Sequence, residues 1–169
     1  MSQPLPSKII ASPVGELTLV AEGDALVAIL WEGDDPARVP LPALADAPDH
    51  PVLCETARQL DEYFAGKRRA FDVPLAFRGT AFQRAVWTAL LRIPFGETSS
   101  YGRIARALDR PHAARAVGAA NGRNPISIIA PCHRVIGSNG ALTGFAGGLA
   151  AKEMLLALER GDETIGNEF

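Results

Sequence analysis

Cysteine and histidine are scarce in this chain, and long hydrophobic runs do not occur. The 169 residues include two cysteines and three histidines, and their spacing lacks the paired ligands of a structural zinc site. No apolar stretch approaches the roughly 18 residues that a membrane-spanning helix needs, and residues 1–6 lack the features of a signal peptide. We therefore expect reduced thiols, no metal or other cofactor, no membrane association and a cytoplasmic protein.

The net charge is small, but its distribution is uneven. Residues 1–75 contain six basic and twelve acidic side chains, whereas residues 76–134 contain nine arginines and only two acidic residues. A basic region on an acidic protein indicates a localised surface for a polyanion. A solvated arginine-rich face without a partner explains the same counts equally well.

The first third of the chain has the pattern of a sheet. Three apolar, β-prone runs occupy residues 8–12, 15–21 and 25–31. Turn signals separate them, which predicts a meander of strands. The segment that follows, residues 33–51, contains five prolines and no hydrophobic period, so we expect a surface loop.

A helix and a returning strand are predicted next. Residues 52–65 carry apolar side chains at helical spacing, and residues 70–75 predict the strand. Cys54 lies in the predicted helix, where a small buried residue is a better interpretation than a reactive thiol.

Helices dominate the remainder. Thr80 and Gln83 form a capping-box signature before an apolar stripe that ends at Pro94. Ser100 is a candidate N-cap of the next helix, and a tight break separates that helix from another at residues 113–121. Two short helices joined in this way are compatible with a helix-turn-helix, although spacing alone is weak evidence for it.

Cys132 and His133 stand side by side after the apolar run at residues 126–130. A thiol is mostly protonated at pH 7, so a neighbouring base or cation is needed to make a cysteine a useful nucleophile. Adjacent side chains on a strand point to opposite faces. The two residues can therefore cooperate only if the chain turns there or if a water bridges them. Further along, Asn139 and Gly140 predict a hairpin turn.

The last predicted helix, residues 149–160, places Glu159 on the same face as Leu155 and Leu156. A carboxylate on an apolar stripe costs free energy unless it has a partner. His133 is a candidate partner, which would give a cysteine–histidine–glutamate relay. A glutamate at the margin of the core is the alternative, and spacing alone favours it.

Residues 113–121 are almost all small residues, six of them alanine or glycine, around one arginine, Arg115. A helix with ordinary side chains is about 10–12 Å wide, whereas the minor groove of B-DNA is only about 6 Å wide. A helix of small residues could approach a minor groove closely, with Arg115 as its long side chain. Close packing of this helix inside the protein is an equally good interpretation.

The motif Pro131-Cys132-His133-Arg134-Val135 resembles the active-site motif of the methylated-DNA–protein-cysteine methyltransferases, also called O6-alkylguanine-DNA alkyltransferases. Further matches to that family lie at residues 79–83, 86–87, 100–101, 104–105, 113–118, 124–125, 147–149, 152–153 and 155–156. The resemblance is dense over residues 79–160 and looser before them. It implies an α+β protein with an N-terminal ribonuclease H-like sheet domain with one helix (1–76). A C-terminal winged helix-turn-helix DNA-binding domain (77–169) would carry the active site.

The same resemblance implies direct repair of DNA. An alkyl group would pass from O6-alkylguanine, and from O4-alkylthymine, in duplex DNA to the protein's own cysteine after base flipping. The implied partner is double-stranded DNA containing alkylated guanine, contacted through its minor groove. The protein would be a monomer in solution that can cluster on DNA. Because a thioether has no activated carbonyl for water to attack, each molecule would be consumed by one lesion.

Catalytic roles follow position by position from the resemblance. Cys132 would accept the alkyl group, and His133, oriented by Glu159, would act as the base through a bridging water. Asn124 would stabilise the turn that presents Cys132. Tyr101 would crowd the phosphate of the target nucleotide and help to swing that nucleotide out of the stack.

Further residues would contact the DNA and line the base pocket. Arg115 would fill the vacated gap in the stack, and the implied DNA contacts also include Ala113, Ala114, Ala116, Gly118, Asn121 and Arg123. The guanine pocket would be lined by Pro131, Val135, Gly144, Phe145, Ala146 and Gly147, with Thr143 in the same loop. Some relatives have a tyrosine and a serine at positions 145 and 146, so Tyr101 is the better candidate to donate to the guanine oxygen here. Some relatives also bind zinc in the first domain, for which this chain has no matching ligands.

Three other functions fit parts of the pattern. A binding-only lesion sensor of the alkyltransferase-like type would lack the acceptor cysteine, whereas this chain has Cys132. A helix-turn-helix transcription regulator needs several base-reading side chains on its recognition helix, and residues 113–120 offer one arginine. A cysteine–histidine hydrolase would turn over repeatedly and would not need the basic region.

Overall fold

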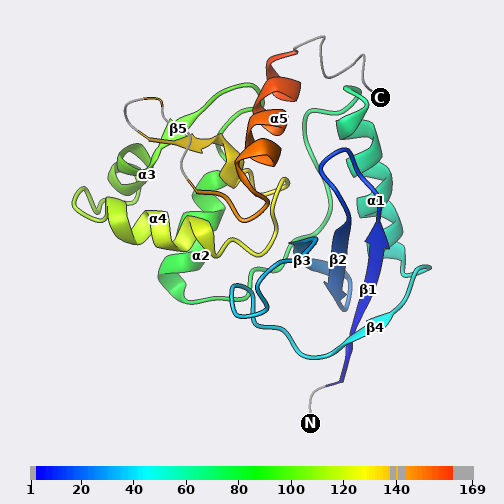
Figure 1. The fold of residues 1–169 in the computed structure, drawn as a ribbon. Coiled ribbons are helices and arrows are strands. Elements are labelled where there is room, and N and C mark those ends of the chain that lie inside the picture. The colour runs from blue at the N-terminus through cyan, green and yellow to red at the C-terminus, as the bar shows by residue number, and fades with distance from the viewer. Residues whose placement is uncertain (1–2, 138–139, 141–143, 162–169) are drawn as a thin grey trace.

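The structure, a computed structural model, describes residues 3–137, 140 and 144–161. A sheet with one helix forms from the first part of the chain, and a cluster of helices forms from the second (Figure 1). The first part comprises β1 (Leu5–Ile10), β2 (Leu17–Glu22), β3 (Ala25–Trp31), β4 (Leu44–Asp46) and α1 (Pro51–Phe64). The second comprises α2 (Ala81–Leu90), β5 (Ser99–Ser100), α3 (Tyr101–Ala107), α4 (Ala114–Gly122), the 3-10 turn η1 (Cys132–Arg134), β6 (Val135–Ile136) and α5 (Leu149–Arg160).

The four-stranded sheet has the order β3-β2-β1-β4. The first three strands form the predicted antiparallel meander, and β4 joins β1 in parallel. The prediction of an uninterrupted loop over residues 33–51 was therefore wrong at β4. All three residues of β4 are exposed, so no burial pattern marks this strand in the sequence.

α1 covers the sheet through Leu53, Leu60 and Tyr63, all of which are buried. Its first residue is a proline, which a helix accepts at that position because the N–H group there needs no intrahelical partner. Cys54 lies on the opposite side of the helix and is exposed. The expectation of a buried Cys54 was wrong; its Sγ lies 3.1 Å from the carbonyl oxygen of Pro48.

The returning strand predicted at residues 70–75 is reduced to a single bridge between Leu26 and Leu75. The amide of Leu26 donates to the carbonyl of Pro74 at 2.8 Å, and the amide of Ala76 donates to the carbonyl of Leu26 at 2.9 Å. Pro74 has no N–H group with which to extend this ladder. This segment therefore lines the outer edge of β3 without becoming a strand.

The helices of the second part begin where the sequence indicates. The side chain of Thr80 accepts from the amide of Gln83, and the side chain of Gln83 accepts from the amide of Thr80, so the capping box at the start of α2 is confirmed. Ser100 caps α3 by accepting from the amide of Arg103 at 3.2 Å.

Among the described residues, no helix is long and apolar enough to cross a bilayer. Asn139, in the predicted hairpin turn, lies outside the described residues.

The segment that follows α4 joins two hydrophobic cores. Ile126, Ile128 and Ile129 pack into the core beneath the sheet, together with residues of β2, β3, α1 and α5. Cys132 and Val135, a few residues later, pack into the core formed by α2, α3 and α4. The amide of Ile29 in β3 also donates to the carbonyl of Pro125 at 2.8 Å. This segment is thus held by both parts of the protein.

Candidate active site

The backbone before Cys132 makes two very tight turns. Ile128 has a positive φ of 74°, and the amide of Ile129 donates across it to the carbonyl of Ser127 at 2.9 Å. This φ > 0 form of the γ-turn is rare and strained, above all for a β-branched residue. Pro131 (φ −81°, ψ 67°) forms a relaxed γ-turn, with the amide of Cys132 donating to the carbonyl of Ala130 at 2.7 Å. The strain at Ile128 persists because the surrounding packing holds it.

Asn124 closes the loop that contains these turns. Its Nδ2 donates to the carbonyl of Ala130 at 2.8 Å, and its Oδ1 accepts from the amide of Ile126 at 3.0 Å. Asn124 is buried, so both ends of its amide are used within the loop. The structure therefore places this side chain in the turn that precedes Cys132, as the sequence resemblance implies.

Cys132 begins the turn η1, so the chain bends where cooperation with the next residue requires it. Its side chain belongs to the buried core, and burial raises the pKa of the thiol. Hydrogen bonds with Asn124 and Ser127 and the positive charges of Arg38 and Lys152 act in the opposite direction. The resting thiol is therefore protonated at neutral pH and needs a base to become a nucleophile.

His133 is fully buried, and its Nε2 lies 2.7 Å from Oε2 of Glu159. Burial lowers the pKa of His133 in spite of the raising effect of Glu159, so the imidazole is neutral at pH 7. Because an ionised carboxylate only accepts, the Nε2 atom carries the proton and Nδ1 keeps its lone pair. Nδ1 is buried and has no hydrogen-bond partner within the described part of the chain. His133 is thus a neutral base with an available acceptor nitrogen.

Glu159 is the centre of a buried polar cluster. Arg134 donates to it from Nε at 2.7 Å and from a terminal nitrogen at 3.0 Å, and the hydroxyl of Tyr63 donates at 2.6 Å. Burial would raise the pKa of Glu159, but the hydrogen bonds from His133, Arg134 and Tyr63 outweigh it and lower the pKa to about 2. The prediction that Glu159 pairs with His133 is confirmed as a contact.

Arg134 also corrects the interpretation of the basic region. It is one of the nine arginines of residues 76–134, but it is buried against Glu159 and donates to the carbonyl of Ile93 at 2.5 Å. Its charge is therefore internal and does not contribute to a polyanion surface.

The loop predicted to line a base pocket packs on the N-terminal sheet. The ring of Phe145 meets Trp31 edge-on, with centroids 5.3 Å apart, and a Cβ on Gly147 would approach atoms of Trp31 to 2.6 Å. The indole N–H of Trp31 donates to Ser127 at 3.0 Å. On the other side of Phe145, the fully buried Lys152 lies 5.9 Å from the ring centroid.

Lys152 also donates to the carbonyl of Val135 at 2.7 Å, so it links α5 to the strand after Cys132. Of the other predicted pocket residues, Pro131 and Val135 are buried, and Gly144 and Ala146 are exposed. Thr143 lies outside the described residues. The structure thus brings Phe145, Lys152 and Val135 together beside Cys132.

α4 presents a stripe of small residues to solvent between two arginines. The exposed members are Arg115, Ala116, Ala119, Gly122 and Arg123. Ala113, Ala114 and Gly118 are half-buried, and Asn121 is buried. The side chain of Asn121 was expected to contact DNA, but it does not lie on this exposed surface. The helix therefore packs inside the domain on one side and offers its narrow side outward.

Tyr101 lies beside α4, at the first position of α3. A Cβ on Gly118 would lie 3.8 Å from its ring, an ordinary contact distance, so the ring lies alongside this part of α4. Tyr101 also packs against the core that contains Cys132 and Val135. It therefore connects the small-residue face of α4 with the surroundings of Cys132.

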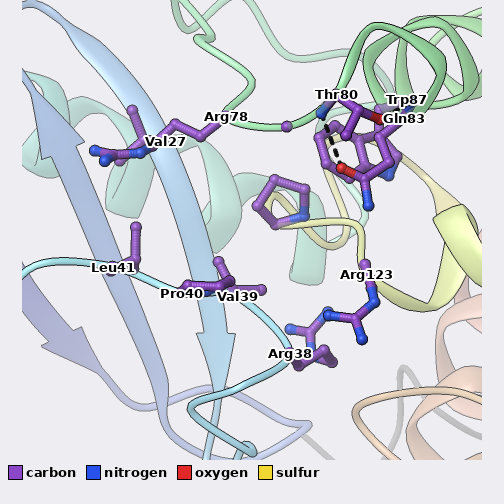
Figure 2. A pocket seen from close by; sticks show the side chains of 12 residues that line it. Val27, Arg38, Val39, Pro40, Leu41, Arg78, Thr80, Gln83, Trp87 and Arg123 are labelled. Carbon is purple, nitrogen blue, oxygen red and sulfur yellow. Dashed lines mark hydrogen bonds between the residues drawn. The ribbon is translucent and has the colours of Figure 1, made fainter.

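A cavity of about 400 Å³ lies between the two parts of the protein, and Figure 2 shows its lining. Arg38 and Arg123 lie side by side at one end of it, and Arg78 lies at the other (Figure 2). Arg38 pairs with Asp34 at 2.7 Å and donates to the carbonyl of Asn124 at 2.9 Å. Cys132 does not line this cavity, but Arg38 acts on the site through its bond to the backbone of Asn124 and through its positive charge.

Arg123 is also tied to the N-terminal part, because it donates to the carbonyl of Ala37 at 3.3 Å. Among residues 3–137, 140 and 144–161, no three His, Cys, Asp or Glu side chains gather in a way that could hold a metal ion.

Several residues around the site carried no signal in the sequence. Tyr63 and Glu159 are 96 residues apart, as are Trp31 and Ser127. Lys152 is the exception. It lies on the same predicted face of α5 as Leu155 and Leu156, and a lysine on an apolar face indicated that it could be buried. These contacts depend on how the sheet and the helical part pack together.

Two family models match most of this chain. Residues 7–77 match the family model described as 6-O-methylguanine DNA methyltransferase, ribonuclease-like domain, and residues 81–161 match its DNA binding domain. A methylated-DNA–protein-cysteine methyltransferase from Mycobacterium tuberculosis is 50% identical over 155 residues, which are 90% of this chain and 91% of that protein. A protein of the same name from Methanosarcina acetivorans is 49% identical over 152 residues, 89% of this chain and 96% of that protein.

A solved structure is similar over nearly the whole length. The crystal structure of Mycobacterium tuberculosis OGT in complex with DNA has a TM-score of 0.85 and 47% sequence identity, and covers 92% of this chain and 93% of that one. The fold is accordingly mixed α+β, with an N-terminal sheet domain and a C-terminal DNA-binding domain. This chain belongs to the 6-O-methylguanine DNA methyltransferase family, whose members repair DNA by transfer to a protein cysteine.

Proposed function

We propose that this protein removes the alkyl group from O6-alkylguanine in duplex DNA by a single, irreversible transfer to Cys132. The thiol sulfur would form a bond to the alkyl carbon as the carbon–oxygen bond to guanine breaks. The thiol proton leaves the sulfur, and the departing guanine gains a proton, so the products are a thioether and an unmodified base. The observation that carries this proposal is a buried Cys132 after a strained, clamped turn, followed directly by His133, whose imidazole is held by Glu159 of α5.

His133 is the proposed base. Its neutral imidazole has an unpartnered, buried Nδ1 within the described residues, next in sequence to a thiol whose pKa burial raises. A water between Nδ1 and the sulfur would carry the proton, because adjacent side chains need such a bridge when they diverge. The ionised Glu159 would stabilise the imidazolium that forms, as in other nucleophile relays.

DNA is the proposed partner, with the small-residue stripe of α4 entering its minor groove. Arg115 would fill the gap left by the flipped nucleotide. Tyr101 is half-buried between α4 and the core that contains Cys132, and it would crowd the phosphate of the flipped nucleotide. Filling the gap offsets part of the few kcal/mol of stacking and pairing that base flipping costs. O4-alkylthymine is a further proposed substrate, and the protein is proposed to act as a monomer that can cluster on DNA.

The base pocket is proposed to lie between Pro131, Val135 and the loop of residues 144–147. Phe145 offers a ring but no hydroxyl, so Tyr101 is the proposed donor to the guanine oxygen as negative charge builds there. The boundary between the two domains is proposed at residues 76–77, where the match to the ribonuclease-like domain (7–77) ends and shortly before the match to the DNA binding domain (81–161) begins.

The test is incubation with duplex DNA that carries isotopically methyl-labelled O6-methylguanine, followed by peptide mass analysis. We expect one labelled methyl group per chain, on Cys132 and not on Cys54. Cys54 is a useful internal control because it is exposed, so a reactive contaminant would modify it first. A labelled Cys54, or a Cys132 left unmodified by excess lesion, would rule out the proposal. Release of free methanol over many turnovers would instead favour a hydrolase.

A further inference from the structure

The hydroxyl of Tyr63 reaches across the domain boundary to the carboxylate of Glu159. The tyrosine lies on α1 of the sheet domain, and its oxygen is 2.6 Å from Oε2 of Glu159 on α5. Both side chains are buried, with Tyr63 1% exposed. A buried hydroxyl needs a hydrogen-bond partner, and a backbone carbonyl would be sufficient for that. The partner of Tyr63 is instead the carboxylate that also binds His133, so the tyrosine can influence the histidine.

The ring of Tyr63 is held from several sides. Phe64, Phe71 and Phe95 surround it, with ring centroids 5.3, 5.5 and 6.3 Å away. A tyrosine packed in this way has little rotational freedom, so its hydroxyl occupies one position. The packing of the sheet domain thus determines where the donor to Glu159 lies.

Oε2 of Glu159 is a shared acceptor. It lies within hydrogen-bond distance of the Tyr63 hydroxyl, of Nε2 of His133 and of a terminal nitrogen of Arg134. The negative charge of this oxygen is divided among its donors, so each hydrogen bond to it weakens the bonds that it makes with the other donors. The position of the oxygen also fixes the direction of the bond from His133 and hence the ring orientation.

We propose that Tyr63 is a positioning residue for alkyl transfer, which fixes the Glu159 carboxylate and through it the tautomer, orientation and basicity of His133. The proposal rests on the proposed role of His133 as base. The sheet domain then contributes to the active site, because the hydroxyl of Tyr63, which donates to Glu159, lies on α1.

The effect of removing the hydroxyl has a definite sign. The charged and titratable groups that act on His133 are Glu159, Arg134 and Lys152, and Cys132 precedes it in the chain. Tyr63→Phe leaves these in place and removes one hydrogen bond from Glu159. The negative charge of Glu159 is then shared less, so it attracts a proton on His133 more strongly, and the pKa of His133 should rise.

The experiment is an NMR titration of the full-length Tyr63→Phe chain with 15N-labelled histidine, beside a pH profile of single-turnover methyl transfer. We expect the His133 titration and the acid limb of the rate profile to move up by about one pH unit. The rate at pH 7 should fall about threefold to tenfold, because the ring of His133 is held less firmly. Duplex affinity should not change.

Phe71→Leu is the matched control. It removes a ring that packs on Tyr63 but leaves the hydroxyl with a partner. We expect a lower melting temperature with the titration of His133 unmoved. A Tyr63→Phe variant that behaves in the same way, with lowered stability alone, would overturn the proposal and leave Tyr63 a structural residue.

A second change covers the case in which Tyr63→Phe folds poorly. The chain has two tyrosines, so 3-fluorotyrosine incorporated in a Tyr101→Phe background labels Tyr63 alone. Fluorine makes the phenol a stronger donor, and the pKa of His133 should then fall; an unmoved titration would contradict the proposal. Because the titration needs no DNA, a failure of the proposed transfer to Cys132 would be visible separately.

Discussion

The buried cluster around Glu159 and the exposed stripe of α4 are built in opposite ways. In the cluster, one carboxylate accepts from Tyr63 on α1 of the sheet domain and from His133 and Arg134 in the turn η1 of the other domain. On α4, the exposed surface comes from a single run of nine residues with small side chains and Arg115. The first region depends on hydrogen bonds between specific side chains, and the second depends on the absence of large side chains.

The difference concerns what each region can tolerate. Removing one partner from a buried charged cluster leaves the others uncompensated in a poorly solvated place, which costs several kcal/mol. Removing or adding one side chain on an exposed helix face changes what can approach it but hardly affects folding. Variants in the two regions should therefore separate chemistry and stability from DNA binding.

Glu159→Gln should give the largest effect. An amide cannot hold the charge that stabilises a protonated His133, and it leaves Arg134 buried without a countercharge. We expect the single-turnover transfer rate to fall about 10²- to 10⁴-fold with duplex affinity retained. Glu153→Gln, at an exposed position of the same helix, is the control and should transfer at the normal rate. A Glu159→Gln chain that transfers normally would show that His133 works without this carboxylate.

Acid should weaken the folded state through the same residue. The pKa of Glu159 is lowered from 4.5 to about 2, so its contribution is complete above about pH 4.5 and is lost as the pH falls toward 2. Such a shift is equivalent to about 3 kcal/mol. Chemical denaturation at several pH values should show this loss in the native chain. Glu159→Gln should lack that part of the slope, and an identical slope would place the acid sensitivity elsewhere.

Arg115→Ala should affect the DNA-binding face alone. Repair of a duplex should weaken about tenfold, or about 1.4 kcal/mol, because nothing then fills the gap left by the flipped base. Reaction with a free O6-alkylguanine base needs no flipping and should change little, which kinetics on the two substrates can compare. Arg92→Ala, an exposed arginine outside α3 and α4, is the control. Equal losses on both substrates would argue against the gap-filling role.

Ala119→Leu should give the smallest effect of the four. Ala119 is exposed in the middle of the stripe, and a leucine there widens a helix that must approach a groove about 6 Å wide. We expect duplex affinity to fall a fewfold, with an unchanged melting temperature and an unchanged rate on the free base. An unaffected affinity in a binding titration would mean that this face does not enter the groove.

Features that depend on neighbouring residues could be predicted from the sequence. The meander of β1 to β3, the capping box of α2 and the limits of α5 follow from hydrophobic period and from side-chain hydrogen bonds three residues apart. Spacing alone favoured a Glu159 at the margin of the core, and it was the resemblance to the alkyltransferase family that implied its pairing with His133. β4 was missed since its three residues are exposed and form no pattern.

The sequence by itself determined that Cys132 and His133 are neighbours and that a narrow helix carries one arginine, because each is a local pattern of residue types. Only the tertiary structure decided that Arg134 is an internal partner of Glu159, that Cys54 is exposed and that Asn121 is buried. It also brought Tyr63 and Trp31 to the site from the sheet domain. The physical reason is that a buried polar group is satisfied by whichever donor the packing of two cores places within about 3 Å, and no spacing along the chain encodes that choice.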